Sequence, residues 1–150
     1  MLKKTPIGSK NAPKAIGPYS QAIVVGEYVY LSGQLGLDPK TNEFVGDDVL
    51  SQAKQVFLNI KALLEAAGSD LEHVIKVEIF LTDMNSFPAI NELYGQIFVN
   101  NNPPVRQTIE VSALPKWAKI MMSCQAILKS GDTNVFYPDI AGKKLAEDFH

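Results

Sequence analysis

The feature that most constrains the fold is an amphipathic run over residues 49–67. Its apolar residues recur every three or four positions, which is the spacing of one buried helical stripe. They stand at 49, 50, 53, 56, 57, 60, 63, 64 and 67. Two aspartates precede the run, where N-capping residues belong, and Gly68 follows it, where a C-cap belongs. The sequence therefore predicts a helix over 49–67 that must bury its stripe against another layer.

Segments rich in β-formers flank this helix and supply the other layer. The run "AIVVGEYVYLSG" (22–33) places two such segments around Gly26 and Glu27, which predicts a hairpin. The run "HVIKVEIFL" (73–81) alternates apolar residues with Lys76 and Glu78, as a strand with one face on the core does. Strand, helix and strand in this order imply a right-handed crossover.

A second helix is predicted over about 85–98, with Pro88 tolerated in its first turn. Phe87, Asn91, Tyr94 and Phe98 share one face of it, so an amide interrupts an aromatic stripe. Whether that amide caps a helix, bonds a loop carbonyl or serves a site is left open at this point.

Two further strands are predicted over roughly 106–112 and 118–128, joined by "LPKW". We expect them to pair as a hairpin, which would put Arg106, Thr108 and Glu110 on the same sheet face as Met121. The resulting order is ββαβαββ. Since both helices need one sheet face, we expect an α+β subunit with two helices on one side of a mixed sheet.

Composition limits the number of domains and the class of partner. The 150 residues, 46% of them apolar, suit one domain over 1–130, followed by an extension over 131–150 of uncertain structure. The net charge of -2 and the lack of a Lys/Arg cluster argue against nucleic acid as the main partner. The chain has one cysteine, Cys124, expected to be a buried small hydrophobe, and no apolar run long enough to span a membrane. A reducing, cytoplasmic location and no membrane partner are expected.

Several kinds of catalytic site have no support in this sequence. With only His73 and His150 present, neither a histidine-based triad nor a histidine metal site is expected. His73 reads as a surface residue before a strand. Function must then rest on arginine, backbone amides, hydroxyl groups and carboxylates, which together suit the binding of a small acid. Arg106, which follows two prolines at the head of a strand, is the leading candidate, although such an arginine is ordinarily a solvated surface residue.

Four segments carry a resemblance to a known family. They are "NAPKAIGPYSQA" (11–22), "YLSGQLGLDPKT" (30–41), "AGSDLEHVIKVEIFLTDMNSFPAINELYGQIF" (67–98) and "PPVRQTIEVSALPKWAKI" (103–120). In order and spacing they resemble the Rid family, also called the YjgF, liver perchloric-acid-soluble protein or endoribonuclease L-PSP family. The resemblance covers roughly residues 8–129.

The resemblance implies a chorismate-mutase-like subunit that forms a homotrimer with clefts between subunits. RidA-type members are imine deaminases, hydrolases acting on C=N bonds. They convert 2-iminobutanoate, 2-iminopropanoate and the related enamines to 2-oxo acids and ammonia, and so detoxify reactive intermediates. They need no cofactor and no metal. Their partners are small 2-imino or 2-oxo carboxylic acids. Other members have been described as endoribonucleases or translation inhibitors.

The resemblance also implies site residues. It makes Arg106 the catalytic clamp for the substrate carboxylate and places Tyr19, Ser32, Gly33 and Asn91 around the same cleft. A guanidinium matches a carboxylate with paired donors, which fixes the imine carbon for attack by a water. Gly33 allows a backbone N–H to approach the ligand. Alternatively, Tyr19 is a turn aromatic, and Ser32 and Gly33 merely end a strand.

One residue departs from the family pattern. RidA-type deaminases carry a glutamate after the Lys-Ile of the last strand, thought to hold the attacking water, and this chain has Met121 there. A thioether cannot transfer protons, so the loss of a general base would cost about 10² to 10⁴ in rate. Thr108 could bind substrate or position the water. The departure leaves open a protein that binds small carboxylates without turnover, and a ribonuclease is a third possibility.

Overall fold

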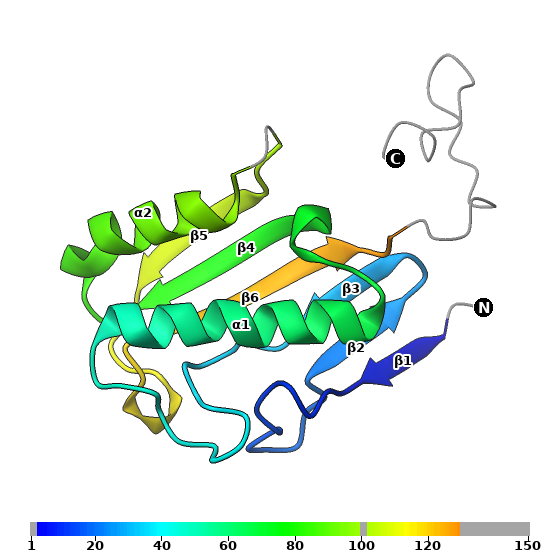
Figure 1. Cartoon of the computed structure of the whole chain (residues 1–150), viewed down its shortest axis with the longest axis horizontal. Coiled ribbons are helices and arrows are strands. Elements are labelled where there is room, and N and C mark those ends of the chain that lie inside the picture. Colours follow the sequence, from blue (N-terminus) through cyan, green and yellow to red (C-terminus); the bar gives the residue numbers. More distant parts are fainter. Residues whose placement is uncertain (1–2, 100–101, 130–150) are drawn as a thin grey trace.

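The computed structural model describes residues 3–99 and 102–129, which form one six-stranded sheet with two long helices across one face (Figure 1). The strands are β1 (Lys4–Ile7), β2 (Ala22–Val25), β3 (Tyr28–Leu31), β4 (Val74–Leu81), β5 (Val105–Glu110) and β6 (Ile120–Ile127). The helices are α1 (Val49–Ala67) and α2 (Phe87–Ile97), with short 3₁₀ turns η1 (Leu71–His73), η2 (Met84–Ser86) and η3 (Pro115–Trp117). The predicted α+β class is confirmed, and β1 is an additional strand at the sheet edge. The proposed extension over 131–150 lies outside the described residues.

The strand order is β1-β2-β3-β6-β4-β5. The predicted hairpin of β2 and β3 is confirmed, whereas the expected hairpin of the last two strands is wrong. β6 pairs antiparallel with both β3 and β4, and β5 pairs parallel with the other edge of β4. The α1 crossover leaves a gap between β3 and β4, and a strand in that gap finds backbone partners on both sides.

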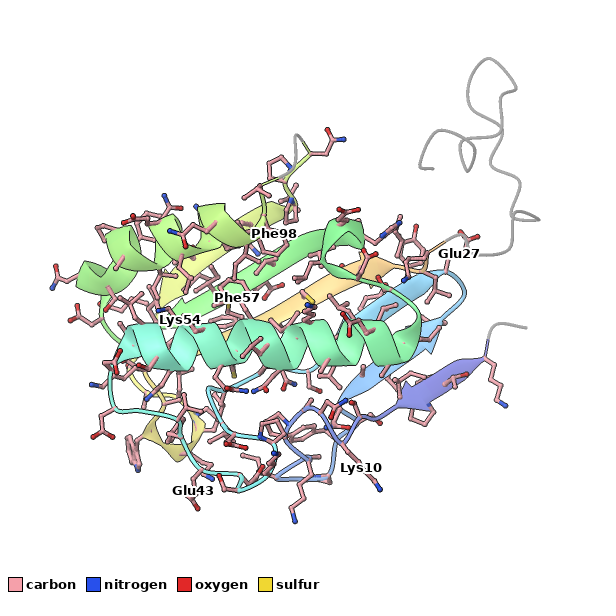
Figure 2. All side chains as sticks on the ribbon, in the orientation of Figure 1. Lys10, Glu27, Glu43, Lys54, Phe57 and Phe98 are labelled. Carbon is pink, nitrogen blue, oxygen red and sulfur yellow. The ribbon has the colours of Figure 1, made fainter. Side chains whose placement is uncertain are left out.

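The core lies between the sheet and the two helices. In β6, Ile120, Met122, Cys124 and Ala126 are buried and face the helices, while the alternate residues are half-buried on the opposite face. The stripe of α1 packs on this layer through Val56, Ile60, Leu63 and Leu64, among others. Each such side chain stabilises the fold by about 1.5–3 kcal/mol on burial. Figure 2 shows Phe57 beside this layer, whereas Lys10 and Glu43 lie at the periphery.

Both ends of α1 lie where the sequence predicts them. The Asp48 carboxylate accepts a hydrogen bond from the Ser51 N–H at 2.9 Å, and Gly68 takes the left-handed conformation with φ 89°. α2 is shorter than predicted, because η2 takes up its first residues.

A buried amide joins α1 to the segment after β3. Asn59 has no exposed surface, and its Nδ2 donates to the carbonyls of Leu35 (3.1 Å) and Leu37 (3.0 Å). Gly36 lies against the backbone of Gln52, so closely that a Cβ would be 2.6 Å from the Gln52 Cα. These contacts fix the segment that begins at Ser32 and Gly33. Within the described residues, neither helix combines the length and apolarity of a membrane span.

Candidate functional site

Arg106 lies near the start of β5 on the helix-bearing face of the sheet, because it aligns with the buried Val77 of β4. Its Nη1 donates to Asn91 Oδ1 at 2.7 Å. Its guanidinium carbon lies 4.7 Å from the ring centroid of Tyr94 and 5.5 Å from that of Phe87. Phe87, Asn91 and Tyr94 follow one another on a single face of α2. We call these three residues, with Arg106 and Thr108, the arginine cluster.

Thr108 lies on the same face of β5, two residues beyond Arg106, where it aligns with Ile79. Its hydroxyl oxygen is buried and has no hydrogen-bond partner among the described residues. A buried hydroxyl without a partner is uncommon in folded proteins. Among the described residues, Thr108 therefore has unused donor and acceptor capacity on the same sheet face as Arg106.

Arg106 is the single arginine of the chain. In the described part of the chain it joins no carboxylate, since the ion pairs there are Asp70–His73 and Lys76–Glu78. The Asn91 amide and the two rings occupy part of its surface, and no carboxylate of the described residues balances its charge. Burial raises the pKa of the neighbouring Tyr94 to about 12, so that hydroxyl remains neutral at physiological pH. A guanidinium held in this way suits a carboxylate ligand.

A second group of predicted site residues surrounds the end of β3. The Ser32 hydroxyl donates to the Ser20 carbonyl at 2.7 Å, and the Ser32 N–H donates to the Gln21 carbonyl at 3.0 Å. These bonds bring Tyr19 close to Gly33, and both line one shallow hollow. We call Tyr19, Ser32 and Gly33 the glycine cluster. Its Tyr19 ring is 46% exposed and its hydroxyl accepts the Ile16 N–H at 3.2 Å.

Met121 belongs to the glycine cluster's surroundings and not to those of Arg106. A Cβ on Gly33 would lie 2.7 Å from the Met121 Sδ, so the thioether covers this glycine. Met121 also packs against a small apolar group that contains Leu35, Leu37 and Leu114. The position at which a glutamate is expected from the resemblance to RidA-type deaminases is thus part of an apolar contact.

The expectation that Arg106 and Met121 share a sheet face is wrong. Arg106 aligns through Val77 with Cys124 on the helix-bearing face, whereas Met121 neighbours Phe80 on the opposite face. β4 separates the two strands, which puts them about 10 Å apart across the sheet. Alternation along two strands predicts a shared face only in the register of their pairing, and β5 and β6 do not pair with each other. Six predicted residues are therefore brought together as two groups of three.

Glu110, the carboxylate on the Arg106 face of β5, has a local partner. Its Oε1 accepts the Met84 N–H at 2.8 Å at the start of η2. This bond ties the end of β5 to the turn that precedes α2. His73 is half-buried beside Asp70, whose carboxylate contacts the His73 ring and caps η1.

Sequence reasoning did not assign Phe87 and Tyr94 to the site. The available signal was their spacing with Asn91 on one face of the second helix, an amide within an aromatic stripe. That spacing is equally typical of a core-facing helix, and Tyr94 does pack in the core, at 6% exposure. Only the parallel pairing of β5 with β4 shows that Arg106 meets this face.

Comparisons with known proteins agree with this architecture. The family model described as Endoribonuclease L-PSP matches residues 9–128. Protein DfrA of Myxococcus xanthus is 48% identical over 128 residues, which cover 84% of this chain and 97% of that protein. The 2-iminobutanoate/2-iminopropanoate deaminase of Homo sapiens is 43% identical over 121 residues, which cover 81% of this chain and 88% of that protein.

Solved structures are similar over the same region. The crystal structure of YyfA from Yersinia pestis, described as a protein of the conserved Rid family, has a TM-score of 0.82 at 41% identity and covers 84% of this chain and 100% of that chain. The structure of the YjgF gene product of E. coli has a TM-score of 0.77 at 39% identity, with 82% and 98% covered.

Proposed function

The chain belongs to the endoribonuclease L-PSP family, also known as the Rid or YjgF family. We propose that it hydrolyses small 2-imino acids to 2-oxo acids and ammonia. Relatives 42–43% identical to it are named 2-iminobutanoate/2-iminopropanoate deaminase. The observation that carries the proposal is the arginine cluster. It holds a guanidinium 2.7 Å from an amide oxygen and above two aromatic rings, with no ion pair to a carboxylate of residues 3–99 and 102–129, an arrangement that suits a carboxylate ligand.

In the proposed reaction the Arg106 guanidinium binds the substrate carboxylate through paired N–H donors. A water attacks the imine carbon: its oxygen forms a new C–O bond, the C=N π bond opens, and one water proton passes to the nitrogen. The second water proton then moves from the new hydroxyl to the nitrogen as the C–N bond breaks, which releases ammonia and leaves the 2-oxo acid. Arg106 lowers the barrier by fixing the imine carbon relative to the water.

We propose that each complete cleft combines the arginine cluster of one chain with the glycine cluster of another, in a homotrimer. In one chain the two clusters lie on strands separated by β6 and β4, and Arg106 and Met121 lie on opposite sheet faces. A ligand of only a few atoms cannot reach across that separation. The helix-free face also exposes apolar side chains for association, namely Tyr28, Tyr30, Val105 and Ile109 at 42–66% exposure.

The test is an imine assay coupled to a threonine dehydratase, in which semicarbazide traps any imine that the protein does not hydrolyse. Wild type should suppress trapping, and Arg106→Ala should not. Lys54→Ala is the matched control, because it removes a cation from an exposed position on α1. Unchanged trapping with a high concentration of assembled wild type would contradict the proposal, as would full activity in Arg106→Ala.

Met121 supports a second candidate, a protein that binds small carboxylates as a sensor without turnover. Its thioether lies against Gly33 within an apolar group and supplies no general base. Calorimetry with 2-oxobutanoate and the imine assay together separate the two candidates, because both predict binding that Arg106→Ala abolishes but only the first predicts turnover. Met121→Glu should raise turnover about a hundredfold if a missing base limits the rate. No change in Met121→Glu would show that another group positions the water.

A further inference from the structure

We infer that Tyr94 is a positioning residue for Arg106, and that its ring, not its hydroxyl, orients the guanidinium. The inference rests on the proposed carboxylate clamp and adds to it the group that sets the direction of the arginine donors. Such direction matters because a planar carboxylate accepts two parallel N–H bonds only in one orientation.

The distances favour Tyr94 over the other aromatic residue in contact. The guanidinium carbon is 4.7 Å from the Tyr94 ring and 5.5 Å from the Phe87 ring. Guanidinium groups are attracted to the face of an aromatic ring at such distances. Tyr94 is therefore the closer ring support of the clamp.

The Tyr94 ring is itself held in place. It is 6% exposed, and its centroid lies 4.6 Å from that of Phe98 and 6.2 Å from that of Phe57. These contacts come from the end of α2 and from α1, so the ring cannot swing away without moving the core. A fixed ring can set the plane of a neighbouring guanidinium, which a mobile ring cannot.

Two contacts then define the orientation of Arg106. The ring limits tilting of the guanidinium, and the 2.7 Å hydrogen bond from Nη1 to Asn91 limits its rotation within that plane. The edge formed by Nε and Nη2 is not used by Asn91, and it offers two parallel donors. A lysine at this position would keep the charge but lose both restraints.

The Tyr94 side chain consists of a ring, which contacts the guanidinium, and a hydroxyl group. Its oxygen is buried and has no hydrogen-bond partner among the described residues. The two parts of the side chain can be tested separately, because Tyr94→Phe removes only the hydroxyl and Tyr94→Leu removes the ring.

Calorimetry with 2-oxobutanoate on the assembled full chain is the first measurement. Tyr94→Leu should raise the Kd about three- to thirtyfold, the range expected for a lost cation–π contact. Tyr94→Phe, which keeps the ring, should have a Kd within about twofold of wild type. Phe57→Leu is the comparison variant, since it removes a buried ring that contacts Tyr94 but shows no contact with Arg106 among the described residues. It loosens one restraint on the Tyr94 ring and leaves the ring itself in place, so its Kd should rise by less than that of Tyr94→Leu.

The Arg106 Nε–Hε resonance is the second measurement, and it is unambiguous because the chain has one arginine. Ring currents should displace it in wild type, Tyr94→Phe and Phe57→Leu, and Tyr94→Leu should move it toward the value of a free arginine. The inference would be overturned if the resonance of Tyr94→Leu stayed at its wild-type position, or if Tyr94→Leu and Phe57→Leu raised the Kd equally. Tyr94→Met provides the same test if the leucine variant does not fold. Failure of wild type to bind 2-oxobutanoate would overturn the proposed clamp itself, while the ligand-free resonance would still decide the placement of the ring.

Discussion

Gly33 and Met121 show, at the scale of single residues, how closely the Met121 side chain is packed in this chain. Gly33 does not adopt a positive φ, so its backbone would accept an alanine. The obstacle is the Met121 side chain, whose Sδ, Cγ and Cε would lie 2.7, 3.0 and 3.2 Å from the new Cβ. The two residues should therefore be energetically coupled.

Gly33→Ala is expected to lower the free energy of unfolding by about 1–3 kcal/mol, the usual cost of overpacking. In a Met121→Ala background the same change should cost less than about 1 kcal/mol, since the obstructing thioether is gone. Chemical denaturation of the four proteins of this double-mutant cycle measures the coupling. Equal costs in both backgrounds would mean that Met121 does not determine the fit.

Cys124 makes the stability of the protein depend on alkaline pH. Burial raises the pKa of this thiol from 9.0 to about 12. Below pH 9 the thiol is protonated in both states and contributes no pH dependence. Above pH 9 the unfolded chain loses the proton while the folded chain keeps it, so the free energy of unfolding should fall by about 1.4 kcal/mol per pH unit.

The measurement compares wild type with Cys124→Val between pH 8 and 11 by denaturant titration. The two curves should run parallel up to about pH 9 and then diverge, with wild type losing stability faster. Other titrating groups are common to both proteins and cancel in the difference. Parallel curves throughout would show that the folded thiol ionises normally.

Two glycines at the scale of secondary-structure elements should respond oppositely to alanine. A Cβ at Gly95, on the exposed face of α2, would meet nothing within 4 Å, whereas one at Gly36 would meet the Gln52 backbone of α1 at 2.6 Å. Gly95→Ala should raise the free energy of unfolding by about 0.5–1 kcal/mol, because glycine is a poor helix former. Gly36→Ala should lower it by about 3 kcal/mol, since backbone cannot yield as a side chain can. Thermal unfolding of both variants tests the pair, and a destabilised Gly95→Ala would contradict it.

How far the sequence predicts these elements depends on the range of the interactions that define them. The bounds of α1 follow from local signals, a periodic stripe between an N-capping aspartate and a glycine C-cap, and they are confirmed. The partners of β6 are strands far from it in the sequence, and the alternation of buried and half-buried residues along β6 would be the same with any partner. Within each cluster, the residues lie close to one another in the chain or on one helix face. The separation of the two clusters across the sheet instead follows from the pairing of β6 with β3 and β4.

At the scale of the whole molecule, the helix-free face of the sheet is the surface that the proposed trimer would use. Tyr30 lies on this face at 42% exposure, aligned with Gln125 of β6. Tyr30→Glu should dissociate the assembly, because a buried charge without a partner is costly. Light scattering after size exclusion gives the mass. Leu58→Glu is the control, since Leu58 is equally apolar and 58% exposed but lies on α1. Equal masses for wild type and Tyr30→Glu would contradict the proposed interface.

The placement of Arg106 and Gly33 in separate clusters has a consequence for inheritance. If each cleft draws one cluster from each of two chains, a subunit with Arg106→Ala still lends an intact glycine cluster to its neighbour. A subunit with Gly33→Leu still lends its arginine. Two alleles that are each inactive alone would then complement one another when coexpressed, because random mixing leaves about one quarter of the clefts with both halves intact. A single defective allele would inactivate only those clefts to which its own subunits supply the altered cluster, so about half of the clefts would stay active in an equal mixture with wild type.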